Sequence, residues 1–104
     1  MQKKGFTSVI IVNYNTKELT LNCVRSLQQH FNPAMYEVII VDNASSDGSV
    51  AYLRNELPQA IVIVNERNAG FGTANNIAAA KANGEYLLLL NSDTLVKHLS
   101  LIHI

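Results

Sequence analysis

Four short apolar runs, spaced along the chain, constrain the fold of this sequence more than any other feature. They cover residues 7–12, 38–41, 61–64 and 86–90. The runs consist mainly of Val, Ile and Leu and lack the polar-apolar alternation of a half-exposed strand. Such runs are typical of strands that are buried on both faces of a parallel sheet. We therefore expect four strands in one mostly parallel sheet.

Helical patterns separate the four runs. Asn15 and Glu18 have the spacing of a helix N-cap and its reciprocal partner, and Thr73 can cap an alanine-rich helix that closes at Gly84. On the first helix the apolar positions are Leu19, Cys23, Val24, Leu27 and Phe31. On the second, which Pro58 ends, they are Val50, Leu53 and Leu57. Strand and helix thus alternate along the chain.

This alternation predicts the α/β class, with a mostly parallel open sheet, right-handed crossovers and helices on both faces. Polar residues follow each predicted strand directly, at residues 13–15, 42–43, 65–68 and 91–93. Ligands of open α/β sheets bind outside the carboxyl ends of the strands. We therefore expect all four polar clusters at one edge of the sheet, around a ligand site.

Composition excludes several classes of protein. The chain has 104 residues, and its eight basic and eight acidic side chains cancel to a formal net charge of zero. The electrostatic signature of a general nucleic-acid binder is therefore missing. Cys23 is the single cysteine, so no intramolecular disulfide forms, and no apolar run approaches the ~20 residues of a membrane span. We expect a protein of the cytoplasm or of the inner face of the membrane.

Three aspartates follow predicted strands and could carry chemistry. Asp93 suits a hard cation such as Mg²⁺ or Mn²⁺, although a turn aspartate would have the same position. Asp42 could accept hydrogen bonds from a ribose hydroxyl or a base N–H, or cap a turn. Asp47 stands in a Ser-Asp-Gly-Ser run that favours a helix start.

Other strand-end residues could contact a flat ligand. Tyr14 could stack on a base or cover the sheet edge, and the loop with Asn68, Gly70 and Gly72 could bring backbone close to a ligand. Asn75 stands where a dinucleotide fingerprint has its third glycine, so we exclude that motif. Cys23 lies on an apolar helix face and is interpreted as a core residue.

Four motifs, taken in order, resemble the N-terminal half of family 2 glycosyltransferases. They are VIIVNYN at residues 9–15, VIIVDNASSDGS at 38–49, NAGFG with the following ANN at 68–76, and LNSD at 90–93. The resemblance implies the GT-A fold, a nucleotide-diphospho-sugar donor, a Mg²⁺ or Mn²⁺ ion and transfer with inversion. The sequences of the first two motifs look most like those of rhamnosyltransferase-type members, which build bacterial surface polysaccharides.

The resemblance also implies roles for individual residues. Val12 and Tyr14 would lie against the base, Asp42 on its pyrimidine edge, and Asp93 on the metal. Asn91 occupies the first acidic position of the family's metal motif, so we expect weak metal binding without the donor. The implied nucleotide-binding set is Val12, Tyr14, Asn15, Asp42, Asn68, Gly70 and Ser92, and the implied donor is UDP- or dTDP-linked.

Family members continue into an acceptor-binding half that supplies the general base. We therefore interpret residues 1–104 as one partial GT-A domain, with the base beyond Ile104 and a glycan or lipid-linked acceptor. The apolar residues 95–104 should then lack their cover and favour self-association. An alternative is a non-catalytic nucleotide-binding module. A receiver-type signalling domain is a third hypothesis, but Asn13 to Asn15 stand where its first acidic cluster would be.

Overall fold

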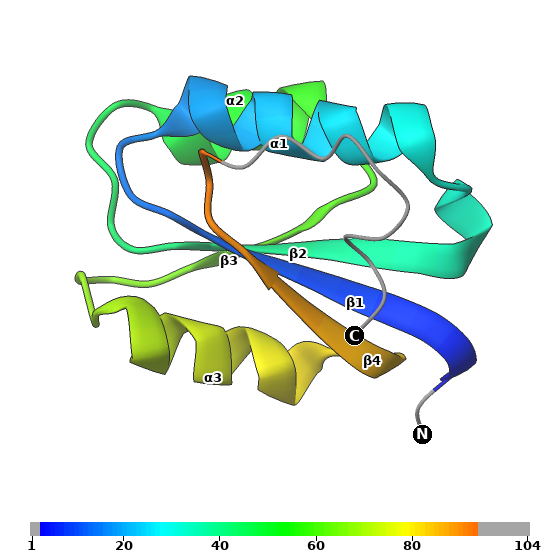
Figure 1. The fold of residues 1–104 in the computed structure, drawn as a ribbon. Helices are drawn as coiled ribbons and strands as arrows, with labels where there is room; N and C mark the ends of the chain where they lie inside the picture. The colour runs from blue at the N-terminus through cyan, green and yellow to red at the C-terminus, as the bar shows by residue number, and fades with distance from the viewer. Residues whose placement is uncertain (1–2, 94–104) are drawn as a thin grey trace.

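A computed structural model of the protein describes residues 3–93, which form a parallel sheet between two layers of helices (Figure 1). The elements follow one another as β1 (Lys3–Asn13), α1 (Lys17–His30), the 3₁₀ turn η1 (Pro33–Met35), β2 (Tyr36–Asp42), α2 (Ser49–Glu56), β3 (Ile61–Val64), α3 (Phe71–Lys81) and β4 (Gly84–Leu90). The predicted α/β class and the four predicted strands are confirmed.

The strand order is β3-β2-β1-β4, and all pairs are parallel. Val9 is aligned with Val38 of β2 and with Leu88 of β4, so β1 has a partner on each side. The chain proceeds outward from β1 to β3 and then returns to the other side of β1 with β4. The order therefore reverses between β1 and β4, which is where parallel α/β sheets bind ligands.

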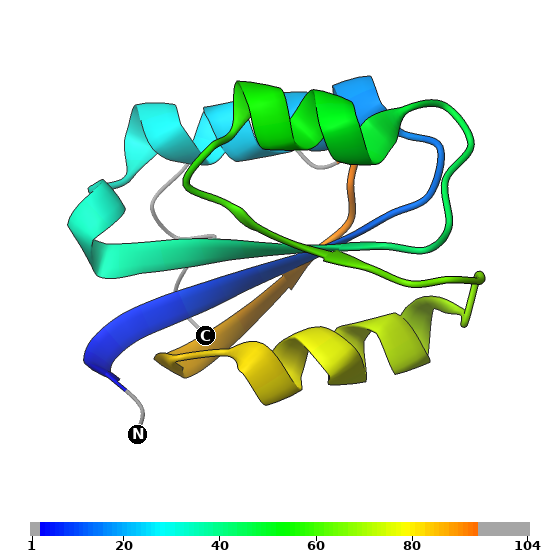
Figure 2. The same cartoon turned by 180° about the vertical axis from the view of Figure 1, so that it is seen from behind.

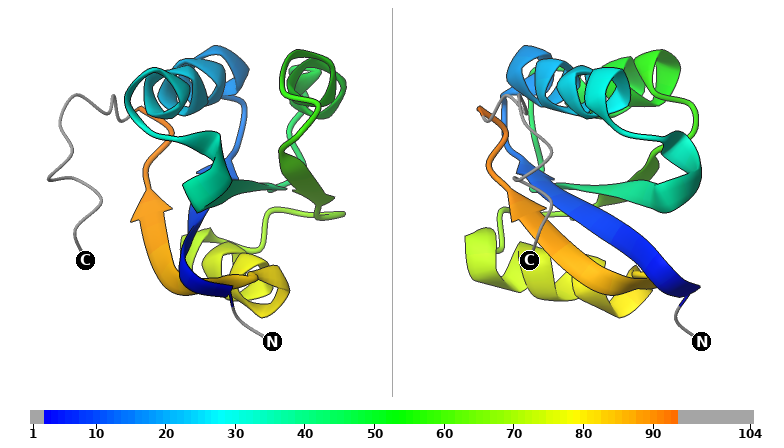
Figure 3. Two further views of the ribbon diagram at one scale, coloured as in Figure 1. Left: turned by 90° about the vertical axis from the view of Figure 1, so that its right-hand side faces the viewer. Right: turned by 45° about the vertical axis from the view of Figure 1, so that its right-hand side comes forward.

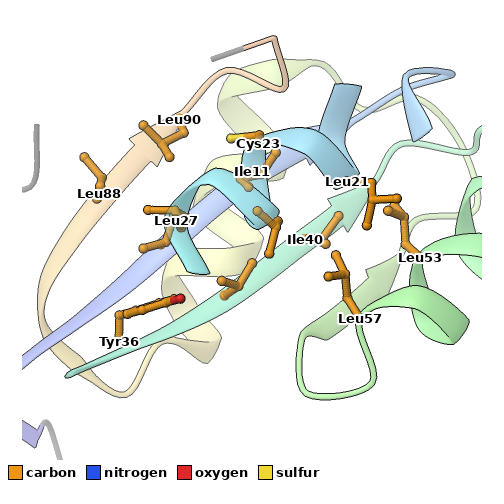
Figure 4. Packing of buried hydrophobic residues seen from close by; sticks show 13 residues of the cluster. Ile11, Leu21, Cys23, Leu27, Tyr36, Ile40, Leu53, Leu57, Leu88 and Leu90 are labelled. Atoms are coloured by element: carbon orange, nitrogen blue, oxygen red, sulfur yellow. The ribbon is translucent and has the colours of Figure 1, made fainter. Parts of the chain in front are cut away.

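Helices α1 and α2 cover one face of the sheet, and α3 covers the other (Figures 1 and 2). The larger core lies under α1 and α2, where alternate residues of β1, β2 and β4 meet the apolar faces of both helices. Its labelled members in Figure 4 are Ile11, Leu21, Cys23, Leu27, Tyr36, Ile40, Leu53, Leu57, Leu88 and Leu90. Cys23 is fully buried there, as predicted.

The core under α3 is smaller, and α3 contributes only alanines to it. Ala74 and Ala78 are fully buried against Ile10, Ile39 and Val41. Since α3 packs on β1 and β2, no helix within residues 3–93 covers the same face of β4 (Figure 3). Leu87 and Leu89 of β4 are accordingly 41% and 52% exposed.

Several predicted helix ends are wrong. The N-cap of α1 is Thr16, not Asn15, and Leu19 is 47% exposed because the buried face of α1 includes Thr20 and Leu21 instead. Helix α3 begins at Phe71, before Thr73. Asn15 instead accepts a hydrogen bond from the Ser46 N–H, which local propensity does not reveal.

Gly84 is the first residue of β4 and does not cap α3. A Cβ at this position would lie 2.6 Å from the backbone nitrogen of Ser8, so the glycine permits the close approach of β4 to β1. No helix within residues 3–93 is long and apolar enough to cross a membrane. The expectation of self-association concerns residues 95–104, which lie outside the described part of the chain.

Candidate functional site

Asn13 connects the carboxyl ends of β1 and β2 to helix α1. Its side chain is fully buried, and its Nδ2 donates to Asp42 Oδ1 over 2.7 Å. Its Oδ1 accepts from Thr20 Oγ1 at 2.7 Å and from Thr16 Oγ1 at 3.1 Å. Both ends of the amide are therefore satisfied, and the strand ends are held in one arrangement.

Asp42 is a buried carboxylate whose acceptor positions are mostly occupied. It is 1% exposed, and its Oδ1 accepts from Asn13 Nδ2 and from Ser45 Oγ. Its Oδ2 accepts from the Ser45 backbone N–H at 2.9 Å. A carboxylate offers about four lone-pair positions, so about one remains, on Oδ2.

Asn15 joins the loop after β1 to the loop after β2. Its backbone is left-handed, with φ 54°, and its N–H donates to Ser45 Oγ at 2.9 Å. Its Oδ1 accepts from the Ser46 N–H at 2.7 Å. Ala44, in the second loop, also has a left-handed φ of 62°. Asn15 thus orders the two loops around Asp42, instead of capping α1 as its sequence position predicts.

Asn43 connects the end of β2 to the loop between β3 and α3. It is 2% exposed, and its Nδ2 donates to the carbonyl oxygen of Gly70 at 3.2 Å. Its Oδ1 accepts from Asn65 Nδ2 at 2.8 Å. Within the same loop, Asn68 Oδ1 accepts from the Gly70 N–H at 2.9 Å. The predicted site residues Asn68 and Gly70 therefore belong to a loop that is anchored on β2.

Ser92 and Asp93 lie in the turn that follows β4, at the point where the strand order reverses. The Thr16 Oγ1 and Ser92 Oγ atoms lie 3.2 Å apart and are hydrogen-bonded, so the turn contacts the start of α1. Below the turn, Cys23 Sγ lies 3.8 Å from the carbonyl oxygen of Asn91. Burial, together with the charge of Asp93, raises the pKa of the Cys23 thiol to about 11. The thiol is therefore neutral at physiological pH.

Asp93 offers an exposed carboxylate beside the Ser92 hydroxyl. Across residues 3–93, no three His, Cys, Asp or Glu side chains gather into a group that could hold a metal ion. Mg²⁺ needs only one or two protein carboxylates where substrate phosphates supply further oxygens. The residues present thus fit a cation that is bound together with a phosphate-containing ligand.

The remaining predicted residues line this edge in different ways. Tyr14 is 48% exposed, and Val12 is half-buried and packs against the core under α3. Asp47 has a structural role, because it accepts hydrogen bonds from the N–H groups of Ser49 and Lys17. Burial raises the pKa of Asp47, but hydrogen bonds from the Ser49 hydroxyl and from the Lys17 and Ser49 N–H groups outweigh it and lower the pKa below its usual value.

Three buried or half-buried amides in the site had no predicted role of their own. Asn13, Asn43 and Asn65 each end a strand or follow it directly, and each bonds to a partner on another element. A run of asparagines at strand ends is the signal that could have identified them. Their partners depend on the strand register, which places Asn13 beside Asp42.

The fold defines a doubly wound α/β domain, and its candidate ligand site lies at the carboxyl ends of β1, β2 and β4. Comparison with protein families agrees with this class. The description "Glycosyl transferase family 2" matches residues 8–102. The chain belongs to glycosyl transferase family 2, as its motifs indicate.

Curated relatives come from bacteria and are much longer than this chain. The glycosyltransferase YfnE of Bacillus subtilis is 37% identical over 91 residues, which are 85% of this chain and 23% of YfnE. The putative teichuronic acid biosynthesis glycosyltransferase TuaG of the same organism is 34% identical, over 86% of this chain and 36% of TuaG. The chain therefore spans about a third of these relatives or less.

Solved structures share the fold. Staphylococcus aureus TarS 1–349 in complex with UDP-GlcNAc is 33% identical, with a TM-score of 0.73, over 85% of this chain and 26% of that one. The curated name of TarS is poly(ribitol-phosphate) beta-N-acetylglucosaminyltransferase. The mannosyltransferase PcManGT of Pyrobaculum calidifontis has a TM-score of 0.83 at 24% identity, covers 92% of this chain and 30% of its own, and supports the fold alone.

Proposed function

We propose that this chain is the donor-binding part of a glycosyltransferase that builds bacterial cell-surface polysaccharide. Its site would bind a nucleoside diphosphate sugar across the carboxyl ends of β1, β2 and β4. The observation that carries the proposal is Asp42, a buried carboxylate that Asn13 and Ser45 hold in place and that keeps one acceptor position. Family membership and the complex of TarS with UDP-GlcNAc support it.

The base would bind between the ends of β1 and β2. Tyr14 is exposed enough to cover a flat ring, and Val12 adds apolar surface beside it. The remaining acceptor position on Asp42 Oδ2 would accept the N3–H of uracil or thymine. Cytosine has a bare acceptor at N3, so an ionised Asp42 would repel it.

The diphosphate would bind at the reversal point, beside Ser92 and the loop that contains Asn68 and Gly70. Asp93 would hold a Mg²⁺ or Mn²⁺ ion there, and the ion when bound would supply positive charge to the leaving diphosphate. In a single inverting displacement, an acceptor hydroxyl would attack the anomeric carbon while the bond to the diphosphate breaks, and the hydroxyl proton would pass to a general base. The residues of this chain bind and orient the donor in that reaction.

Calorimetry of the purified protein with UDP, dTDP, CDP and GDP tests the proposal. UDP and dTDP should bind, and CDP should bind roughly five- to 150-fold more weakly, which is the range for an unsatisfied acceptor. GDP serves as the purine control. If none of the four nucleotides binds, the donor-binding function is wrong. If CDP binds as tightly as UDP, Asp42 does not recognise the base.

The finer expectations stay predictions. They are the UDP or dTDP donor, inversion at the anomeric carbon, a rhamnosyltransferase-like subtype, a glycan or lipid-linked acceptor, and a location in the cytoplasm.

A further inference from the structure

Asn43 is placed to control a loop that it does not belong to. It follows the last residue of β2, and its side chain is 2% exposed. Its backbone N–H donates to the carbonyl oxygen of Asn13 at 2.9 Å, which continues the β1–β2 pairing by one residue. The position of the Asn43 side chain is therefore fixed by the sheet itself.

Both polar ends of the Asn43 amide bond to the segment between β3 and α3. Nδ2 donates to the Gly70 carbonyl at 3.2 Å, and Oδ1 accepts from Asn65 Nδ2 at 2.8 Å. The Ala69 N–H also points to Oδ1, at 3.5 Å. One buried amide thus bonds to the beginning and the end of the loop.

The end of this loop sets the start of α3. Gly70 is the N-cap of α3 and has a left-handed φ of 84°. Its N–H bonds to Asn68 Oδ1, and its carbonyl oxygen accepts from Asn43 and from the Ala74 N–H at 3.2 Å. Losing the bond from Asn43 would release the Gly70 peptide, and with it the backbone that leads into the first turn of α3.

We infer that Asn43 is a positioning residue, which sets nucleotide affinity by holding residues 65–70 in their binding shape without touching the ligand. The inference rests on the proposed donor-binding function. Its physical basis is preorganisation: a loop that is already ordered loses less conformational entropy when the ligand binds. A loop released from Asn43 would have to be ordered by the nucleotide itself.

The substitution Asn43→Asp tests this with almost no change in shape. An ionised aspartate has no donor for the Gly70 carbonyl, and one of its oxygens would face that carbonyl oxygen. A protonated aspartate regains an O–H donor and keeps an acceptor for Asn65. Burial raises the pKa of a carboxyl, so protonation falls within a testable range. Asn55→Asp, on the exposed side of α2, is the control for the added charge.

Two measurements distinguish a residue that positions the loop from a residue that contacts the nucleotide directly. The first is the UDP affinity of the variant relative to that of the unmodified protein, measured at each pH so that pH effects common to both proteins cancel. We expect Asn43→Asp to bind about tenfold more weakly at pH 8 and to recover most of the loss at pH 5.5. The second is hydrogen exchange of the Ala69 and Gly70 amides without ligand, which should accelerate at neutral pH while the amides of β1 do not change.

The outcomes are distinct. Weaker binding with faster loop exchange and recovery at low pH supports the inference. Weaker binding with unchanged exchange would mean that Asn43 contacts the nucleotide directly, which overturns it, as does unchanged affinity. If Asn43→Asp fails to fold, Asn65→Ala removes one loop contact and should give a smaller loss of the same kind. If the unmodified protein binds no nucleotide, the proposed function fails, and loop exchange still decides whether Asn43 holds the loop.

Discussion

Asn13 and Asp42 are directly aligned partners on β1 and β2, and their buried side chains are joined by a 2.7 Å hydrogen bond from Nδ2 to Oδ1. Each side chain satisfies a group that would otherwise be buried without a partner. Because Asn13 and Ser45 Oγ occupy Oδ1, the remaining acceptor position of Asp42 is on Oδ2, where within residues 3–93 only the Ser45 N–H bonds. Asp42 would therefore serve both the stability of the fold and the proposed recognition of the base.

Asp42→Asn should lower both stability and base selectivity. Three donors bond to the two carboxylate oxygens, and an amide has only one oxygen, so one donor loses its partner. We expect a loss of about 1–3 kcal/mol in the free energy of unfolding and a narrower difference between UDP and CDP affinity. Asp47→Asn is the control, since it weakens a cap but should leave the UDP to CDP ratio unchanged. A ratio that Asp42→Asn also leaves unchanged would contradict base recognition.

Asp93→Ala should remove the metal-dependent part of nucleotide binding. Asp93 is the only carboxylate of the 91–93 turn, so Mn²⁺ alone should bind weakly, and better when a diphosphate supplies further oxygens. Calorimetry with UDP, with and without Mn²⁺, measures the difference. Glu85→Gln, at the opposite end of β4, should keep the full metal dependence. If nucleotide binding by Asp93→Ala depends on the metal as much as it does in the unmodified protein, Asp93 is only a turn residue.

The protein should lose stability between pH 9 and pH 11 because of Cys23. The pKa of this thiol is raised from 9.0 to about 11 in the folded chain, so in this interval the unfolded chain binds fewer protons. The free energy of unfolding must then fall as the pH rises, by about 2–3 kcal/mol across the interval. Denaturant unfolding at each pH measures this slope. In Cys23→Ala the free energy of unfolding should depend less on pH in this interval. An equal slope in both proteins would contradict the assignment of the pH dependence to Cys23.

Asn75→Leu should stabilise the fold. Asn75 is 8% exposed on the sheet-facing side of α3, and within residues 3–93 its Oδ1 is buried without a hydrogen-bond partner. Replacing an unsatisfied buried amide by an apolar side chain of similar volume should raise the free energy of unfolding by about 1 kcal/mol. The exposed Asn76→Leu is the matched control and should change it by less than about 0.5 kcal/mol. Destabilisation by Asn75→Leu would show that the amide has a partner.

Ala44→Gly and Ala51→Gly should have different effects. Ala44 has a left-handed φ of 62°, which costs a residue with a Cβ about 1–2 kcal/mol, whereas Ala51 lies inside α2. Glycine therefore relieves strain at position 44, which offsets its entropic cost, and costs about 1 kcal/mol at position 51. In thermal unfolding, the free energy of unfolding of Ala44→Gly should be at least about 1 kcal/mol higher than that of Ala51→Gly. Equal losses would mean that the loop after β2 is unstrained.

The sequence predicts the sheet well because the strands are buried on both faces. The runs at residues 38–41, 61–64 and 86–90 all lie within strands, and only β1 extends far beyond its apolar run, back to Lys3. The helix ends are predicted poorly. Asn15 and Gly84 have the right chemistry for caps, but contacts with Ser46 and with Ser8 determine their roles. Thr73 lies inside α3, which begins two residues earlier.

The sequence predicts where the candidate site lies, but it does not predict which of its side chains are hydrogen-bonded to one another. Polar residues after each strand must gather at one edge of a parallel sheet, which places Tyr14, Asp42 and Asp93 on the same side. Which amide bonds to which carboxylate depends on a register that pairs Asn13 with Asp42 and on loop backbones with left-handed residues. For this reason Asn43 has the appearance of an ordinary turn residue in the sequence, although it anchors a loop more than twenty positions away.

The central place of β1 has a consequence for synthesis on the ribosome. β1 is complete at Asn13, but its partner on one side, β4, is complete only at Leu90. At about 5–20 residues per second, roughly 4–15 s separate the two events. During that interval β2 can pair with one edge of β1, and the other edge presents unpaired backbone groups beside Ile10 and Ile11. The nascent chain thus carries an open apolar strand edge that only its own later translation can close.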